Sequence, residues 1–169
     1  MLKISKLTDY GTVVMAYLAN NNGPMNVHAA KDIAQQTHVA LPTVSKLLKL
    51  LARAGLLAAH RGVKGGYSLA YRPEAISLAQ IIQAMEGDIS LTECGHHSGL
   101  CAMETLCAIR NNWRTISGVI HDALKSISLA DMTKPIINNK TIRQSIVKQL
   151  PKIKTSVKTR AYSYDRSRN

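Results

Sequence analysis

The sequence predicts a mainly α-helical fold with one small β-hairpin, and three patterns support that prediction. Apolar residues recur at helical spacing over residues 6–20 and again over 109–127. Two further helical patterns between residues 29 and 54 are joined by a short turn, and two strand-like runs flank a glycine-rich turn at 61–66. Because 46% of the 169 residues are apolar, we expect one small domain with a buried core, with or without an appendage.

The first half of the chain predicts two helices joined by a turn, after a helix over "KLTDYGTVVMAYLAN" that "NNNG" ends. A short helix is expected around Ala29 to Gln36, followed by a four-residue turn and a second helix. Pro42 suits the first position of that helix, and Gly55 suits its C-terminal stop. Its apolar stripe consists of Val44, Leu47, Leu48 and Leu51. Two helices with a short turn between them are the helix-turn-helix arrangement.

Two short strands, "LLAAH" and "YSLAY", are expected on either side of "RGVKGG", whose glycines permit a tight turn. A hairpin directly behind a helix-turn-helix is the wing of a winged helix. Ser77 and Gln80 then form a candidate capping box for a short helix that Gly87 ends. The predicted fold class is therefore mainly α with a small hairpin wing, a winged helix-turn-helix followed by a long helix.

A long amphipathic helix is predicted over residues 109–131, and its apolar stripe needs a partner. We expect a second copy of the chain to cover it, because twofold homodimers are the commonest oligomers, with packing on the first helix as the alternative. From Pro135 the pattern is weak, and we expect partial disorder with one short helix near Thr141 to Leu150. The stripe consists of Ile109, Trp113, Ile116, Val119, Ile120, Ala123, Leu124 and Ile127.

The net charge of the chain is +12, but its distribution is more informative than its total. Residues 135–169 contain nine Lys or Arg and one acid, so much of the excess belongs to the tail. Between Ile33 and Pro73, however, there is no Asp or Glu, and this range spans the second helix and the wing. A phosphate backbone suits such a segment, with a solvated basic face on a protein-binding winged helix as the alternative. Its basic side chains are Lys46, Lys49, Arg53, Arg61, Lys64 and Arg72.

Double-stranded DNA is therefore the expected partner, contacted by the second helix and the wing. Residues near the start of such a helix are expected to meet base edges, and wing cations are expected to reach a minor groove or phosphates. A dimer presents two such helices, which predicts an inverted-repeat operator. The candidate DNA-binding residues are Thr43, Ser45, Lys46, Lys49, Arg53, Arg61 and Lys64.

All three cysteines lie in one polar window, "CGHHSGLCAMETLC". Three thiols cannot all pair with one another, and a reducing cytosol keeps them as thiols, so metal or redox chemistry is the leading expectation. The spacing of Cys94, Cys101 and Cys107 is too wide for a simple CxxC zinc knuckle. A structural zinc site completed by His96 or His97 and a metal-free thiol sensor are the alternatives. A hydrolase that pairs Cys94 with His96 is disfavoured, because the two residues are too close in sequence.

Three segments resemble the Rrf-type bacterial transcription regulators, a family that includes IscR, NsrR and RirA. They are "ISKLTDYGTVVMAYLA", "VALPTVSKLLKLLARAGLLAAHRGVKGGYSLA" and "ISLAQIIQAMEGDISLTEC", and the resemblance covers residues 1–131. Within the family, the chain looks most similar to the regulators of the SUF iron-sulfur assembly system. The resemblance implies a homodimeric winged-helix protein, dimerised by the long helix after the cysteines, whose DNA binding responds to an iron-sulfur cluster. We expect the cluster-bound form to repress genes for cluster assembly.

The resemblance also implies that Cys94, Cys101 and Cys107 hold a [2Fe-2S] or [4Fe-4S] cluster, for which thiolates are suitable ligands. Clusters usually take four ligands, so the fourth must come from elsewhere or stay open. The IscR branch of the family has a histidine where this chain has Arg110, so that assignment does not carry over. The NsrR branch uses an acid of the opposite subunit, and the matching residue here is Asp9.

His96 or His97 is the alternative fourth ligand. An oxygen or nitrogen ligand holds iron less tightly than a thiolate does, and a labile position suits a sensor. The IscR pattern also has an acid in the second helix of the helix-turn-helix where this chain has Ser45, so no operator sequence is transferred.

The expected organisation has four parts: a winged helix-turn-helix DNA-binding domain over 1–87, a cluster-binding loop over 88–108, a dimerisation helix over 109–131 and a basic tail over 132–169. No apolar run approaches the roughly 20 residues that span a bilayer, and no signal peptide is evident, so a cytoplasmic location away from membranes is expected. Neither enzymatic activity nor a small-molecule substrate is expected. A regulator of the same fold with structural zinc, a thiol redox switch or nitric oxide sensing is the alternative.

Overall fold

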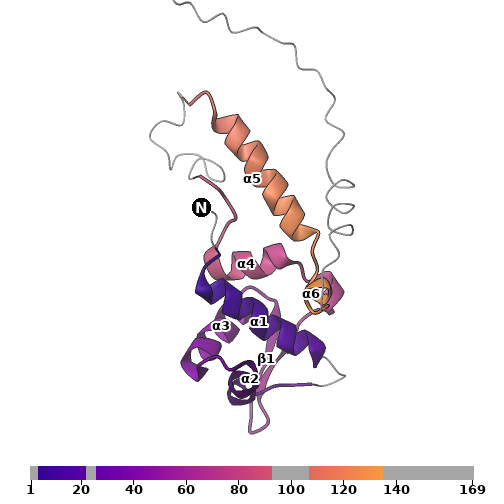
Figure 1. Ribbon diagram of the computed structural model, residues 1–169. Coiled ribbons are helices and arrows are strands. Elements are labelled where there is room, and N and C mark those ends of the chain that lie inside the picture. Colours follow the sequence, from indigo (N-terminus) through magenta and orange to yellow (C-terminus); the bar gives the residue numbers. More distant parts are fainter. Residues whose placement is uncertain (1–3, 22–25, 93–106, 135–169) are drawn as a thin grey trace, which may run out of the picture.

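The computed structural model describes residues 4–21, 26–92 and 107–134, which form the mainly helical fold with one hairpin that the sequence predicts (Figure 1). The elements are α1 (Lys6–Asn20), α2 (Ala30–Thr37), α3 (Leu41–Arg53), β1 (Leu57–His60), β2 (Gly66–Leu69), the 3₁₀ helix η1 (Pro73–Ala75), α4 (Leu78–Glu86), α5 (Arg110–Lys125) and α6 (Leu129–Met132). No helix in these three ranges is long and apolar enough to cross a membrane.

Helix α1 has the bounds that the sequence predicts. Ser5 caps its N-terminus, because the serine hydroxyl oxygen accepts the Thr8 N–H at 3.2 Å. Val14, Met15 and Leu18, on the inner face of the helix, are buried in the core. Burial of this apolar face, rather than helix propensity alone, stabilises the helix.

Helices α2 and α3 form the predicted helix-turn-helix, with small differences at the junction. Thr37 ends α2 and Leu41 begins α3, so the turn has three residues instead of four. His38 redirects the chain with a left-handed φ of 56°. Pro42 occupies the second position of α3 instead of the first, and its missing N–H is tolerated there because it has no intrahelical partner. The whole predicted stripe of α3 is buried, as Val44, Leu47, Leu48 and Leu51.

Strands β1 and β2 form an antiparallel hairpin that pairs His60 with Gly66, so Gly66 belongs to the second strand and not to the turn. The chain before α2 adds a bridge to this hairpin, since His28 and Tyr67 exchange two backbone hydrogen bonds of 2.9 Å. Glycine is required at position 66, because a Cβ there would overlap the His28 carbonyl. The bridge anchors the base of the wing to the segment that leads into α2.

Helix α4 has the capping box that Ser77 and Gln80 predict. The Ser77 hydroxyl oxygen accepts the Gln80 N–H at 3.3 Å, and Gln80 Oε1 accepts the Ser77 N–H at 2.8 Å. Gly87 follows the helix with a φ of 82°, a conformation that favours glycine and ends the helix as predicted.

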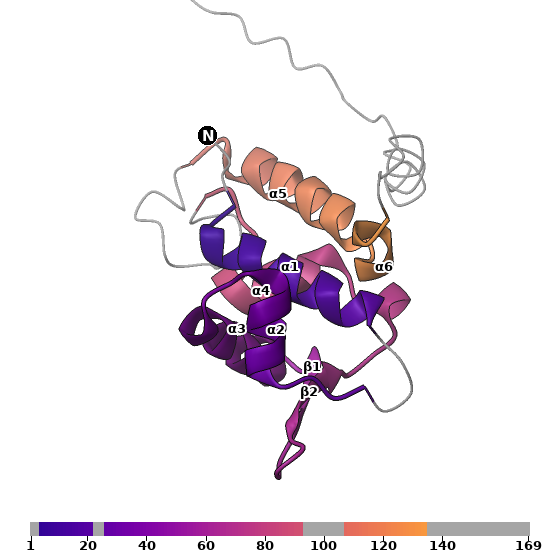
Figure 2. The same cartoon turned by 60° about the horizontal axis from the view of Figure 1, so that its bottom comes forward.

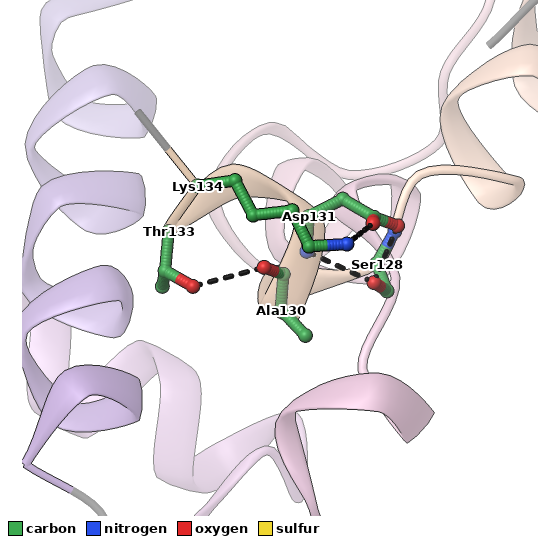
Figure 3. Close-up of polar contacts among 5 residues, drawn as sticks. All are labelled: Ser128, Ala130, Asp131, Thr133 and Lys134. Atoms are coloured by element: carbon green, nitrogen blue, oxygen red, sulfur yellow. Dashed lines mark hydrogen bonds and ion pairs between the residues drawn. The ribbon is translucent and has the colours of Figure 1, made fainter. Parts of the chain in front are cut away.

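The single helix expected over residues 109–131 is instead two helices, because α5 ends at Lys125 and α6 begins after Ser128. The Ser128 hydroxyl oxygen accepts the Asp131 N–H at 3.1 Å, and Asp131 Oδ2 accepts the Ser128 N–H at 3.1 Å (Figure 3). Lys134 forms an ion pair of 2.6 Å with Asp131 Oδ1. Hydrogen bonds from Lys134 and Ser128 lower the pKa of Asp131 from 3.8 to about 2.

This break has a tertiary cause, because Leu129 belongs to the core of the winged-helix part. Its side chain is fully buried, and its N–H donates to the Ile76 carbonyl at 2.7 Å. The Leu78 N–H donates to the Ile127 carbonyl at 2.8 Å in return. The chain after α5 therefore packs back onto the elements that precede the cysteines. The core consists of Val14, Met15, Leu18, Ile33, Val39, Val44, Leu47, Leu48, Leu51, Leu56, Leu57, Ile76, Ile81 and Leu129.

Candidate functional site

Helix α3 presents a polar, positively charged face on the side opposite its buried stripe. Ser45, Lys49 and Arg53 follow one another at intervals of four residues, so they lie along one side of the helix. Lys46, Lys49 and Arg53 are exposed, and Ser45 is half-buried. The predicted residues of this helix therefore share one accessible surface. A shallow hollow of about 300 Å³ runs along it, lined by Pro42, Ser45, Lys46, Lys49, Leu50 and Arg53.

The first turn of α3 is open to an anion. Ala40 precedes the helix and provides no side-chain cap, and the turn contains no acid. Backbone N–H groups and the positive end of the helix dipole suit a phosphate at such a position. Thr43 is half-buried in this turn, whereas Leu41 is exposed and was not singled out from the sequence. An exposed apolar side chain there suits contact with a thymine methyl group.

The hairpin carries the other two predicted cations, Arg61 and Lys64, and both are exposed. It projects from one end of the molecule, and α5 lies at the other end in both views (Figures 1 and 2). Helix α3 packs beside β1, at the base of the hairpin. Within the described ranges, none of the five cations on α3 and the hairpin takes part in an ion pair. We call the set Ser45, Lys46, Lys49, Arg53, Arg61 and Lys64 the cationic face.

Of the predicted metal ligands in the cysteine window, the structure describes Cys107 alone. It is half-buried and precedes the first turn of α5, where its carbonyl accepts the Arg110 N–H at 3.3 Å. Cys94 and Cys101 lie outside the described residues, and so do His96 and His97. In the part of the chain that is described, no three His, Cys, Asp or Glu side chains gather closely enough to hold a metal ion. The predicted ligand set therefore stays a prediction.

Both flanks of the cysteine segment, residues 88–108, are attached to α5. On the C-terminal side the segment runs into the helix itself. On the N-terminal side, the Leu91 N–H donates to the Ser117 hydroxyl at 3.3 Å. Ser117 is 4% exposed and is one of two buried polar residues among those described, the other being Thr8. A buried hydroxyl that accepts a backbone N–H fixes the entry of the segment against the middle of α5.

Glu86, the last residue of α4, connects the end of α4, just before the cysteine segment, to the start of α1. Its Oε1 accepts the Ser5 N–H at 3.0 Å and the hydroxyl of the buried Thr8 at 2.5 Å. These two hydrogen bonds hold the pKa of the Glu86 carboxyl below its usual value, and the bond from Thr8 has the larger effect. Asp9, the predicted fourth ligand, is exposed on the same turn of α1. Sequence reasoning missed Glu86, because its partners lie about 80 residues away and no local pattern reports such a pair.

The packing continues from α4 through α1 to α3. A Cβ at Gly11 would lie 3.2 Å from Met85 Sδ and 3.6 Å from Leu47 Cδ2. Gly11 therefore marks a point where α1, α4 and α3 meet closely. Segments adjacent to the cysteines are thus packed against the helix that carries most of the cationic face.

Helix α5 leaves part of its apolar stripe uncovered. It lies against α4 rather than α1, and Ser117 is its one buried residue. Ile109, Ile116 and Val119 are 55%, 44% and 41% exposed. The exposed part of this stripe is a candidate interaction surface. The other stripe residues, Trp113, Ile120, Ala123, Leu124 and Ile127, are half-buried.

A helix-turn-helix followed by a hairpin, with cations on both, defines a winged-helix DNA-binding protein. The chain belongs to the Rrf2 family, whose family model, described as "Iron-dependent Transcriptional regulator", matches residues 4–135. The predicted family is confirmed, and the relatives are named as transcriptional regulators and not as enzymes.

Comparison with individual relatives supports the same fold and class. An HTH-type transcriptional regulator of Synechocystis is 34% identical over 134 residues, which are 78% of this chain and 87% of that protein. The structure of CymR, the global cysteine regulator of B. subtilis, is 33% identical, with a TM-score of 0.61 over 79% of this chain and 97% of its own. That of T. potens IscR is 30% identical, with a TM-score of 0.58 over 78% of this chain and 85% of its own.

Proposed function

We propose that the chain is a homodimeric repressor of iron-sulfur cluster assembly genes, of the SUF kind, and that an iron-sulfur cluster controls its affinity for an inverted-repeat operator. The observation that carries the proposal is the attachment of the cysteine segment. Its entry is bonded to Ser117 of α5, and Glu86 bonds the preceding helix to α1. A cluster bound by the three thiols of this segment can therefore influence how the two subunits, and the cationic face of each, are arranged.

The donor set that the chain offers suits this group. Cys94, Cys101 and Cys107 supply three thiolates, the ligands that iron-sulfur clusters prefer. Cys107 is half-buried at the start of α5, which limits its exposure to water. When bound, a [2Fe-2S] or [4Fe-4S] cluster supplies a sulfide-bridged iron centre that cross-links its ligands and that iron shortage, oxidants or nitric oxide remove or alter.

We assign the fourth position to Asp9 of the partner subunit, with His96 or His97 as the alternatives. Asp9 is exposed in the first turn of α1. Beside it on the same helix, Tyr10 and Val13 are also exposed, at 39% and 41%. A partner subunit that covers these two apolar side chains also meets Asp9.

The dimer is proposed to form through α5. Its exposed apolar residues would be removed from water by a second copy of the helix, which stabilises association. Two protomers related by a twofold axis then present two cationic faces, as an inverted repeat requires.

Regulation is proposed as a shift between arrangements of these two faces. The cysteine segment begins next to Glu86 and ends at α5, so joining its thiols restricts the positions of α1, α4 and α5 relative to one another. A ligand from the partner subunit extends that restriction across the dimer. The cluster can change DNA affinity by no more than the difference in affinity between the restricted and the unrestricted arrangement.

Anaerobic purification of the full chain tests the cofactor. We expect a brown protein with iron and acid-labile sulfide equivalent to about one cluster per protomer, and we expect alanine at Cys94, Cys101 or Cys107 to remove both. A colourless protein with stoichiometric zinc would contradict the cluster and indicate a structural zinc site. A metal-free protein whose DNA binding changes on thiol oxidation would contradict the cluster and indicate a thiol redox switch.

Gel-shift titrations with cluster-loaded and cluster-free protein test the regulation. We expect the loaded form to bind its operator more tightly. Equal affinities would contradict the proposal, and a response to nitric oxide without any response to iron supply would assign the protein as a nitric oxide sensor.

Salt titrations of DNA binding test the cationic face. Lys46→Ala and Lys49→Ala are each expected to lower the slope of log K against log salt by roughly one, because each neutralised phosphate releases a counterion. Lys125→Ala is the matched control, since Lys125 is also exposed but belongs to α5 and not to the helix-turn-helix or the wing. Slopes that respond equally to all three changes would contradict this placement.

A further inference from the structure

The tip of the wing is a tight turn whose shape depends on two glycines. The Gly65 N–H donates to the Gly62 carbonyl at 2.9 Å, which makes Val63 and Lys64 the two central residues of a β-turn. Gly62 has a φ of 113°, a conformation that favours glycine. A Cβ at Gly65 would lie 2.5 Å from the His60 carbonyl oxygen, so no side chain fits there. The turn therefore holds Val63 in a defined place.

Val63 is by far the most exposed large apolar residue in the described ranges. Its relative exposure is 108%, whereas the other exposed large apolar residues lie between 39% and 57%. Isolated apolar residues on a protein surface need no special explanation. Val63 differs because it is a central residue of the turn that ends the hairpin, which projects from the molecule (Figure 2), and the exposed cations Arg61 and Lys64 flank it in the sequence.

We propose that Val63 enters the DNA minor groove and makes the wing prefer A·T pairs at the position it reaches. The inference rests on the proposed DNA binding and adds a base preference to it. Arg61 and Lys64 suit the phosphates on the two walls of the groove, and no acid between Ile33 and Pro73 opposes them. Because this segment is positively charged, it favours contact of the wing with DNA over contact with a second copy of this basic chain.

The base preference follows from what the groove floor offers. An A·T pair shows acceptors alone, whereas a G·C pair adds the guanine 2-amino group, which projects into the groove. A valine side chain can neither accept a hydrogen bond from that amino group nor leave it hydrated, so the amino group gives up a water molecule without replacement. The narrow groove of A·T tracts also has the more negative potential, which favours Arg61 and Lys64.

The test uses a duplex selected from a random-sequence pool by the full chain purified anaerobically, with the minor-groove footprint of the wing mapped by hydroxyl radicals. Val63→Thr keeps the side-chain shape and exchanges a methyl for a hydroxyl group. We expect this variant to bind roughly fivefold more weakly, because a hydroxyl group gains less than a methyl group from burial in the groove. The melting temperature should not change, because the side chain is fully exposed.

A second comparison isolates the groove. Replacing adenine by 2,6-diaminopurine at the wing position adds a 2-amino group to the minor groove and leaves the major groove unchanged. We expect the unaltered chain to lose affinity roughly fivefold and Val63→Thr to lose less, since its hydroxyl can accept from the added group. The same replacement under α3 should have no effect.

Unchanged affinity of Val63→Thr together with unchanged sensitivity to diaminopurine would overturn the inference. A change in sedimentation with no change in DNA binding would also overturn it, by placing Val63 against a second copy of the chain. Failure of the proposed function is separately visible: the chain would select no duplex, or Lys46→Ala would bind as well as the unaltered chain.

Discussion

Helices α3 and α5 both carry a continuous apolar stripe, but the structure uses the two stripes differently. In α3 all four stripe residues, Val44, Leu47, Leu48 and Leu51, are completely buried. In α5 the buried residue is Ser117, and Ile116 and Val119 are exposed. The reason is what lies opposite: α3 packs against α1, α2 and α4, whereas α5 packs mainly against α4, which leaves Ile109, Ile116 and Val119 exposed and the other stripe residues half-buried. The same pattern therefore marks a core in one helix and a partly exposed surface in the other, which we propose that a second copy of the chain covers.

The largest effect is expected when the α3 stripe is shortened. Leu48→Ala should lower the free energy of unfolding by roughly 2–5 kcal/mol, because it removes buried methyl groups and leaves a cavity. Urea denaturation followed by circular dichroism measures this. Leu41→Ala is the control, since Leu41 belongs to the same helix but is exposed. Equal destabilisation of the two variants would mean that the α3 stripe is not part of the core.

The matching change in α5 should affect association instead of folding. Ile116→Lys combined with Val119→Lys is expected to convert dimers into monomers, because two buried charges would oppose each other and their symmetry mates. Sedimentation velocity measures the change, and far-UV circular dichroism should stay that of a folded chain. Asn111→Lys places one such charge on the polar side of α5 and should leave the dimer intact. A variant that unfolds instead would make the α5 stripe a core surface like that of α3.

A smaller effect is expected at the bond between α1 and α4. Thr8→Val removes the hydroxyl that donates to Glu86 and should cost about 1 kcal/mol of unfolding free energy at pH 7. The folded-state pKa of Glu86 is lowered, so this contribution is present above the unfolded value of 4.5 and is lost as the pH falls through the lower folded value. The difference between Thr8→Val and the unaltered chain should therefore shrink in acid. A difference that stays constant from pH 7 to about pH 3 would show that the Glu86 charge does not contribute.

The smallest effect is expected at the capping box of α6. Asp131→Asn should cost about 0.5 kcal/mol near neutral pH, because Lys134 is exposed and solvent screens the pair. The pKa of Asp131 is lowered from 3.8 to about 2, so its contribution is present above about pH 4 and is lost as the pH falls toward 2. Chemical denaturation at a series of pH values measures this. Asp122→Asn, on the exposed surface of α5, is the control, and the same acid dependence in both variants would rule out the capping box as its source.

Local patterns were sufficient for most of the winged helix. The α3 stripe, the Ser77–Gln80 capping box and the glycine stops depend on residues a few positions apart, so their geometry can be predicted from spacing. The break before α6 also had a local signal, because Ser128 and Asp131 are spaced as a capping box. The amphipathic stripe through Ile127 favoured one continuous helix and so concealed this signal. In the structure, burial of Leu129 in the core outweighs the helical period of the stripe.

The shared face of the candidate DNA-binding residues on α3 was predictable for a different reason, while their contact with DNA stays a prediction. The absence of acids between Ile33 and Pro73 is visible in the sequence, and the helical period places Ser45, Lys49 and Arg53 on one side. Interactions between distant residues left no such trace. Glu86 with Thr8, Leu91 with Ser117 and His28 with Tyr67 each join separate elements, and no local rule predicts them.

The sequence by itself determined where helices and strands form and which of their sides are apolar or charged, because spacing, capping and charge act over a few residues. Tertiary structure alone decided which apolar sides found a partner inside the chain. It buried the α3 stripe completely and left that of α5 partly exposed, and it ended the long helix early so that Leu129 could fill the core. The physical reason is that burial depends on what lies opposite in space, and a residue's neighbours in sequence do not specify that.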